Sequence, residues 1–100
     1  MTNRLQVGID FSQKHADFCL LAADGQVLES HRTFANSLTG YAAAKQLLLD
    51  TLDTYDFTGL DISGEATGYL WLPFFLQLAA DPDLNLRNLE LFLLNPRWVK

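Results

Sequence analysis

The first third of the chain carries three short segments with the pattern of β-strands, and this restricts the fold more than any other feature. Apolar residues alternate with polar or small ones over residues 5–10, a period of two that is typical of a strand with one buried face. A second apolar run covers residues 16–22, and the Asp-Gly pair at residues 24–25 is a strong hairpin signal. Residues 26–34 are then predicted to return as a third strand, so the chain should begin with an antiparallel meander.

A helix is predicted next. Asn36 and Ser37 offer a cap for it, and Gly59 marks the break after it. Its apolar face is formed by residues that recur at spacings of three and four, namely Leu38, Tyr41, Ala44, Leu48, Leu52 and Tyr55.

The remaining residues predict a strand, a second helix and a last strand. Residues 60–65 alternate again. The second helix should begin within residues 69–72, because Pro73 is tolerated only in the first turn, and it should end before the Asp-Pro pair at residues 81–82. Residues 89–94 form an apolar run that is typical of a strand covered on both faces.

The element order is therefore βββαβαβ. We expect an α/β fold with one mixed five-stranded sheet and flanking helices, in which the first three strands are antiparallel and the fourth is parallel to the first. This is the ribonuclease-H-like (RuvC-like) arrangement. The 100 residues suffice for one domain, and 49% hydrophobic residues allow a real core.

Two acidic residues stand at the ends of predicted strands. Asp10 ends the first strand and Glu65 ends the fourth. If these strands are parallel neighbours, both carboxylates emerge at the edge where such sheets bind ligands. Carboxylates held together there bind Mg²⁺, and metal pairs activate a water or hydroxyl for phosphodiester cleavage. We expect Asp10 and Glu65 to be metal ligands and catalytic residues; the alternative is that each acid merely ends its strand in solvent.

Three blocks of sequence resemble the DEDD-type insertion-sequence transposases. Residues 7–14 (VGIDFSQK) resemble the VGIDVSK opening of that family, and residues 64–73 (GEATGYLWLP) resemble its EATG-x-[YW] block. Residues 94–100 (LNPRWVK) resemble its NP-[RK]-x-[VT]-[KR] block. The blocks stand in family order, and together they are far more specific than any one of them alone.

The resemblance implies a function and an incomplete site. Asp10 and Glu65 match the first two acids of the DEDD set, and the last two belong to a segment after the third block. Residues 1–100 are thus expected to be the N-terminal part of a RuvC-like nuclease domain, inactive alone, within an Mg²⁺-dependent DNA transposase or recombinase. A further region with a proposed serine nucleophile is also absent. The resemblance implies DNA as partner and, with no residue here to show it, a guide RNA.

Small and hydroxylated residues near the two acids have competing interpretations. Gly64 and Gly68 either let DNA or metal approach Glu65, or serve a strand-to-helix turn. Thr67 either orients the site or caps a helix. Ser12 is expected to bond nearby backbone and not to act as a nucleophile.

Other candidate residues are weaker. Lys14 and Arg97 either contact DNA phosphate or are solvated loop charges, and His15 and His31 are expected at the surface because no zinc-ligand spacing accompanies them. Cys19 is expected in the core.

The aromatic stretch of the second helix is expected to be core or a partner interface and not a base-stacking platform. It comprises Tyr69, Trp71, Phe74 and Phe75. We further expect an exposed apolar patch on this helix or at Trp98, with homo-oligomerisation left open.

The remaining composition bounds the class of protein. A net charge of −5 disfavours a self-sufficient nucleic-acid binder. One cysteine, no signal-peptide pattern and no long apolar segment indicate a cytoplasmic protein without a membrane span. Two rival functions are an ATPase or sugar kinase of the same fold, which lacks support because no glycine turn follows Asp10, and a non-catalytic interaction module.

Overall fold

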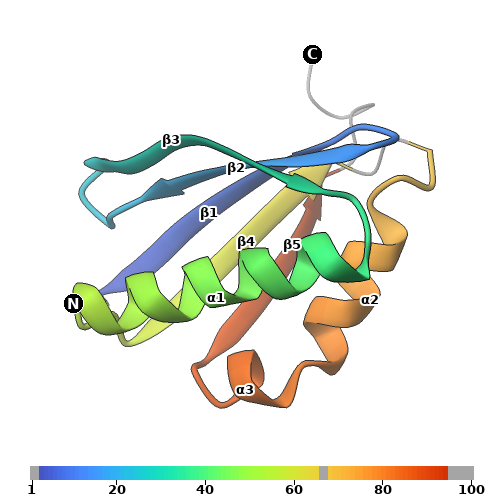
Figure 1. Ribbon diagram of the computed structural model, residues 1–100. Coiled ribbons are helices and arrows are strands. Elements are labelled where there is room, and N and C mark those ends of the chain that lie inside the picture. Colours follow the sequence, from blue (N-terminus) through green and yellow to red (C-terminus); the bar gives the residue numbers. More distant parts are fainter. Residues whose placement is uncertain (1–2, 66–67, 95–100) are drawn as a thin grey trace.

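The computed structural model describes residues 3–65 and 68–94, and these form one layer of sheet with helices on one side (Figure 1). In chain order the elements are β1 (Arg4–Phe11), β2 (His15–Leu21), β3 (Val27–Ala35), α1 (Leu38–Thr54), β4 (Gly59–Glu65), α2 (Leu72–Ala80), α3 (Pro82–Asn85) and β5 (Leu89–Leu94). The expected order is confirmed, apart from the short helix α3, which the sequence pattern did not predict. Its first turn is capped by Asp81, whose side chain accepts hydrogen bonds from the two amides at residues 83 and 84.

The sheet has the order β3-β2-β1-β4-β5 in the described part of the chain. β1 pairs antiparallel with β2, and β2 with β3. β1 pairs parallel with β4, and β4 with β5. The predicted mixed sheet, with an antiparallel meander and a fourth strand parallel to the first, is therefore confirmed.

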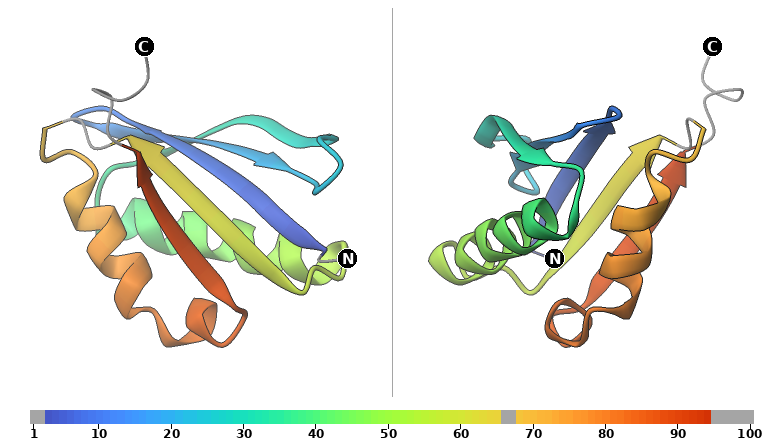
Figure 2. Two further views of the ribbon diagram at one scale, coloured as in Figure 1. Left: turned by 180° about the vertical axis from the view of Figure 1, so that it is seen from behind. Right: turned by 45° about the vertical axis from the view of Figure 1, so that its right-hand side comes forward.

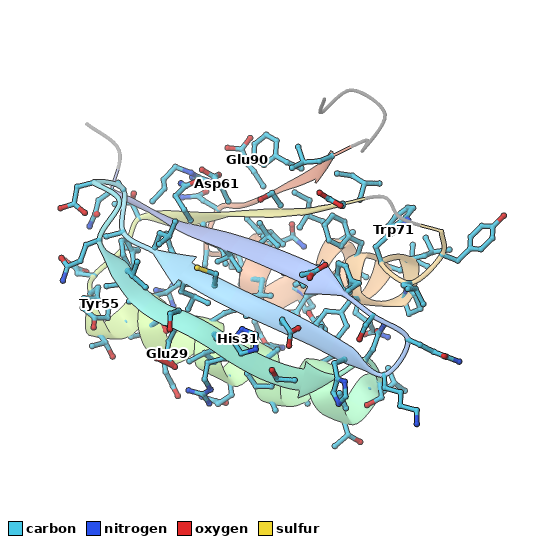
Figure 3. All side chains as sticks on the ribbon, turned by 90° about the horizontal axis from the view of Figure 1, so that it is seen from above. Glu29, His31, Tyr55, Asp61, Trp71 and Glu90 are labelled. Carbon is cyan, nitrogen blue, oxygen red and sulfur yellow. The ribbon has the colours of Figure 1, made fainter. Side chains whose placement is uncertain are left out.

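One face of the sheet carries the hydrophobic core. On β1 the alternation buries Leu5, Val7 and Ile9, and on β4 it buries Leu60 and Ile62. Both longer helices pack on this face, as the two views of Figure 2 show. We call the opposite face the open face, because no helix of the described residues covers it; Figure 3 looks onto it, with α1 and α2 behind the sheet.

Helix α2 is joined to this core by aromatic residues. It begins at Leu72 with Pro73 in its first turn, as predicted. Phe74 is 1% exposed and lies at the centre of edge-on contacts with other rings of the core. Phe74 and Phe75 are both buried, which confirms the core interpretation for them and excludes them from the expected exposed patch; Leu76 of the same helix is exposed. Trp98 lies outside the described residues.

The last strand corrects a second expectation. β5 was predicted to be covered on both faces, but it is an edge strand, and Phe92, Leu93 and Leu94 are exposed. The apolar run was a poor guide because burial depends on neighbours, and no described element lies beyond β5 or over the open face. Exposed apolar side chains thus include those at the end of β5, Tyr69, and Leu76 on α2.

A buried polar cluster fastens α1 to the α2–α3 junction. The Tyr41 hydroxyl donates to Asp81 Oδ2 at 2.6 Å, and Lys45 Nζ lies 3.1 Å from Asp81 Oδ1. Burial raises the pKa of the Asp81 carboxyl, but the hydrogen bonds from Tyr41, Lys45 and the Leu84 amide outweigh it and hold that pKa below its usual range. Asp81 thus stabilises the fold as a carboxylate.

This cluster makes stability depend on pH in a defined direction. Because the folded-state pKa of Asp81 is lowered, its contribution is present above the unfolded pKa of about 4 and is lost as the pH falls through the folded value. Tyr41→Phe should lower the free energy of unfolding by about 1–3 kcal/mol at pH 7, and urea denaturation at pH 3 should show a smaller deficit. Tyr55→Phe, at a half-exposed tyrosine, is the control. A deficit independent of pH would contradict this account.

Candidate active site

Asp10 and Glu65 lie at the same edge of the sheet and on the same face. Asp10 is the second-last residue of β1, and Glu65 is the last residue of β4. These strands are parallel neighbours, with Gly8 opposite Ser63 and Ile9 opposite Gly64. Since Ile9 and Gly64 face the core, the next residue of each strand faces the open face, and both acids are exposed.

A pocket of about 370 Å³ lies over this part of the open face, and both acids line it. Its lining comes from the carboxyl-terminal halves of β1 and β4 and from the facing parts of the other strands, and it comprises Gly8, Ile9, Asp10, Asp17, Phe18, Cys19, Ser30, His31, Ser63, Gly64, Glu65 and Leu94. A β-carbon at Gly8 would meet no atom within 4 Å. The glycine therefore leaves its part of the pocket floor without a side chain.

A third carboxylate, which the sequence pattern did not reveal, lies beside Asp10. Asp17 of β2 is the register partner of Asp10 across the β1–β2 ladder. Its Oδ1 accepts a hydrogen bond from Thr33 Oγ1 at 2.6 Å and lies 3.8 Å from His31 Nε2. The Ser12 amide donates to the His15 carbonyl, and the hairpin closed by this turn places residues 10 and 17 opposite each other.

The donor set suits a hydrated hard cation better than a closed metal cage. No cluster of three or more metal-ligating side chains occurs in the part of the chain that the structure describes. Mg²⁺ commonly binds one or two carboxylates and keeps several waters. Asp10 and Glu65, opening into a pocket with room at Gly8, fit that mode.

The two glycines around Glu65 serve the backbone and the core. A β-carbon at Gly64 would come within 3.1–3.2 Å of the rings of Phe11 and Phe75, on the core face and away from the site. Gly68 has a φ of 58°, which favours glycine. Gly64 therefore serves packing of the core, and Gly68 serves the turn after β4.

The other candidate residues lie in the β1–β2 turn or on the strands that line the pocket. Ser12 accepts a hydrogen bond from the His15 amide at 3.2 Å, so it closes a turn as expected. His15 and His31 are exposed, as predicted, although His31 lines the pocket. Cys19 was expected in the core, but it is only partly buried and lines the pocket, because alternation along β2 turns it to the open face. Lys14 is exposed in the β1–β2 turn.

Thr67 and Arg97 lie outside the described residues. Among the described residues, none of the helices has the length and hydrophobicity that a membrane span requires.

The strand order and the strand directions define a ribonuclease-H-like fold of the RuvC type. The chain is similar to RuvC of T. thermophilus, whose structure is a complex with a Holliday junction substrate, with a TM-score of 0.55 and 13% sequence identity. The match covers 93% of this chain and 64% of the RuvC chain, so this chain spans less than two thirds of that protein.

Two further structures, both Ppx/GppA family proteins of Aquifex aeolicus, match with TM-scores of 0.47, at 10% and 11% identity. They match over 93% of this chain and over 35% and 36% of their own chains. No protein-family model and no curated protein matches the chain.

The opposed carboxylates predict a measurable repulsion in the absence of metal. Asp10→Asn should raise the free energy of unfolding by about 0.2–0.5 kcal/mol at low salt, because like charges on directly opposite residues destabilise a strand pair. The gain should shrink at high salt. A double-mutant cycle with Asp17→Asn provides the control: in that background the gain should vanish. Additive effects of the two substitutions would show that the carboxylates do not interact.

Proposed function

We propose that this chain is the N-terminal part of a DNA transposase or recombinase of the DEDD insertion-sequence type. In this proposal Asp10 and Glu65 are two of the ligands of a catalytic Mg²⁺ that serves phosphodiester cleavage and strand transfer. The observation that carries the proposal is the convergence of both acids on one pocket at the carboxyl ends of two parallel strands. Among proteins with a RuvC-like fold, the three sequence blocks favour the DEDD-type transposase family.

The chemistry asked of these residues is to hold and orient a cation. Asp10 and Glu65 would each supply a carboxylate oxygen, and Asp17 next to them adds negative potential that attracts a divalent ion. A bound Mg²⁺ would polarise the phosphodiester and activate the attacking oxygen. The room over Gly8 would admit the phosphate backbone to the open face.

On this proposal the other two acids of the set and most DNA contacts lie outside these 100 residues. The net charge of −5 agrees with this division, since a carboxylate site needs basic surface elsewhere to hold DNA. DNA is the proposed partner, by analogy with the junction bound to RuvC. A guide RNA rests on the family resemblance alone, and homo-oligomerisation stays open.

The two rival functions have less support. For an ATPase or sugar kinase, the turn after Asp10 should cradle phosphate with free amides, yet the amides of Ser12 and His15 are engaged within the turn. In a non-catalytic module, the repulsion between the opposed carboxylates of Asp10 and Asp17 would lower the stability of the fold and serve no function. In a cation site, the bound ion would offset this repulsion.

Neutral isosteres of the two acids test the proposal in the full-length protein. Asp10→Asn and Glu65→Gln should each reduce Mg²⁺-dependent DNA cleavage by more than about 100-fold, because each removes a charged metal ligand and keeps the shape. Glu90→Gln is the matched control, since Glu90 is an exposed carboxylate near the other end of the neighbouring strand β5. Near-normal cleavage by either site variant would show that the wrong acids are named.

The isolated 100-residue chain should not cut DNA at any Mg²⁺ concentration that supports the full-length protein. Two carboxylates hold Mg²⁺ weakly, because the ion keeps most of its water, and a second ion would lack ligands. A nicking assay on supercoiled DNA compares the two proteins directly. Metal-dependent nicking by the short chain, abolished by Asp10→Asn, would mean that its site is already complete.

A further inference from the structure

One side chain links the loops that follow the two acids. The Asn36 Nδ2 amide donates to the Ser12 carbonyl at 3.1 Å and to the Leu70 carbonyl at 3.0 Å. Its backbone amide donates to the Lys14 carbonyl at 2.9 Å. Ser12 follows Asp10 by two residues, and Leu70 belongs to the segment between Glu65 and α2. Asn36 therefore connects both loops at the edge of the sheet where the acids lie.

This link lies where the backbone hydrogen-bond ladder between β1 and β4 ends. Among the described residues, the last pair of the β1–β4 ladder is Ile9 with Gly64, one residue before each acid. Beyond that point Asp10 pairs outward with β2, and Glu65 pairs outward with β5. Each acid is thus held by a strand on its own side, and the ladder does not bridge the gap between them in the described residues.

The chemistry of Asn36 suits a link at a metal site. Two carbonyl oxygens face the carboxamide, so only its NH₂ end, with two donors, can satisfy both. A lysine or arginine could make the same bonds, but a cation there would compete with the metal for the two carboxylates. The amide joins the loops without adding charge. Ser37, and not Asn36, caps helix α1, through a bond from the Gly40 amide, which leaves the Asn36 side chain for this role.

We propose that Asn36 is a positioning residue for the active site, which fixes the separation of Asp10 and Glu65 by joining the loops that follow them. The inference rests on the proposed function of these acids as metal ligands. In this proposal Asn36 is neither a metal ligand nor a DNA contact. Its effect is geometric, and small misplacement of reacting groups is enough to slow a reaction by about 100-fold.

Asn85 offers a matched control. Its Nδ2 amide also donates to two carbonyls, those of Ala79 at 3.0 Å and Asp81 at 2.7 Å, at the α2–α3 junction on the other side of the fold from the pocket. Asn36→Ala and Asn85→Ala each remove two such hydrogen bonds. Asn36→Leu keeps the side-chain volume and removes the NH₂ donors without adding charge, so it separates hydrogen bonding from volume.

Cleavage by the full-length variants is the first measurement. Asn36→Ala and Asn36→Leu should lower kcat by about 10-fold to 100-fold and raise the Mg²⁺ concentration needed for half-maximal rate, with KM for DNA unchanged. The Asn85→Ala variant should cut at the wild-type rate, even if its thermal stability falls as much as that of the Asn36 variants. Cleavage by both Asn36 variants that matches Asn85→Ala at every Mg²⁺ concentration would overturn the proposal.

A distance measurement gives a readout that does not require activity. Spin labels at the exposed positions Gln13 and Tyr69, in the full-length protein with Cys19→Ser, report the separation of the two loops. The distribution of distances between the two labels should broaden in Asn36→Ala and stay narrow in Asn85→Ala. An unchanged distribution in Asn36→Ala overturns the inference. If the wild-type protein cuts no DNA but the distance distribution broadens in Asn36→Ala, the proposed nuclease function is wrong and the role of Asn36 in linking the loops is still supported.

Discussion

The parallel pairing of β1 with β4 is the contact on which the rest of this structure depends. It runs from Arg4 opposite Gly59 to Ile9 opposite Gly64. The pairing is stabilised by burial, since Leu5 and Leu60 are both fully buried beneath α1 and α2. Parallel strands need a crossover, and here β2, β3 and α1 lie between them in the chain. This topology brings two acids that are distant in sequence to one edge of the sheet.

The two ends of this strand pair are fastened by different chemistry. At the amino ends, Arg4 Nη2 of β1 lies 2.7 Å from Asp61 Oδ1 of β4 and 3.3 Å from Glu90 Oε2 of β5, which ties three strands together. The hydrogen bond from Arg4 lowers the pKa of Asp61 despite its partial burial. At the carboxyl ends the link is the neutral amide of Asn36. The charged clamp thus stays away from the pocket, where a guanidinium would neutralise the carboxylates.

The open face explains where sequence patterns succeeded and where they failed. Alternation predicts which face of a strand is apolar, and it correctly placed Ile9 in the core and Asp10 outside it. It does not say whether a second layer covers the other face. Cys19 and the end of β5 were expected to be buried, and both are accessible because no described element packs over them. Phe74 and Phe75 are buried because α2 turns them onto the sheet, in agreement with the core interpretation of the aromatic stretch.

By itself the sequence determined the strand and helix order, the mixed sheet and the two strand-end acids, because these follow from periodicity, turn residues and the position of Pro73. Only the tertiary structure decided what surrounds those acids. Asp17 reaches Asp10 through the register of a hairpin, and Asn36 reaches both acid loops through side-chain hydrogen bonds to residues distant in the sequence. Neither neighbour has a spacing that marks it in the chain. Periodicity records which side of an element is buried, whereas the contacts between elements depend on register and packing.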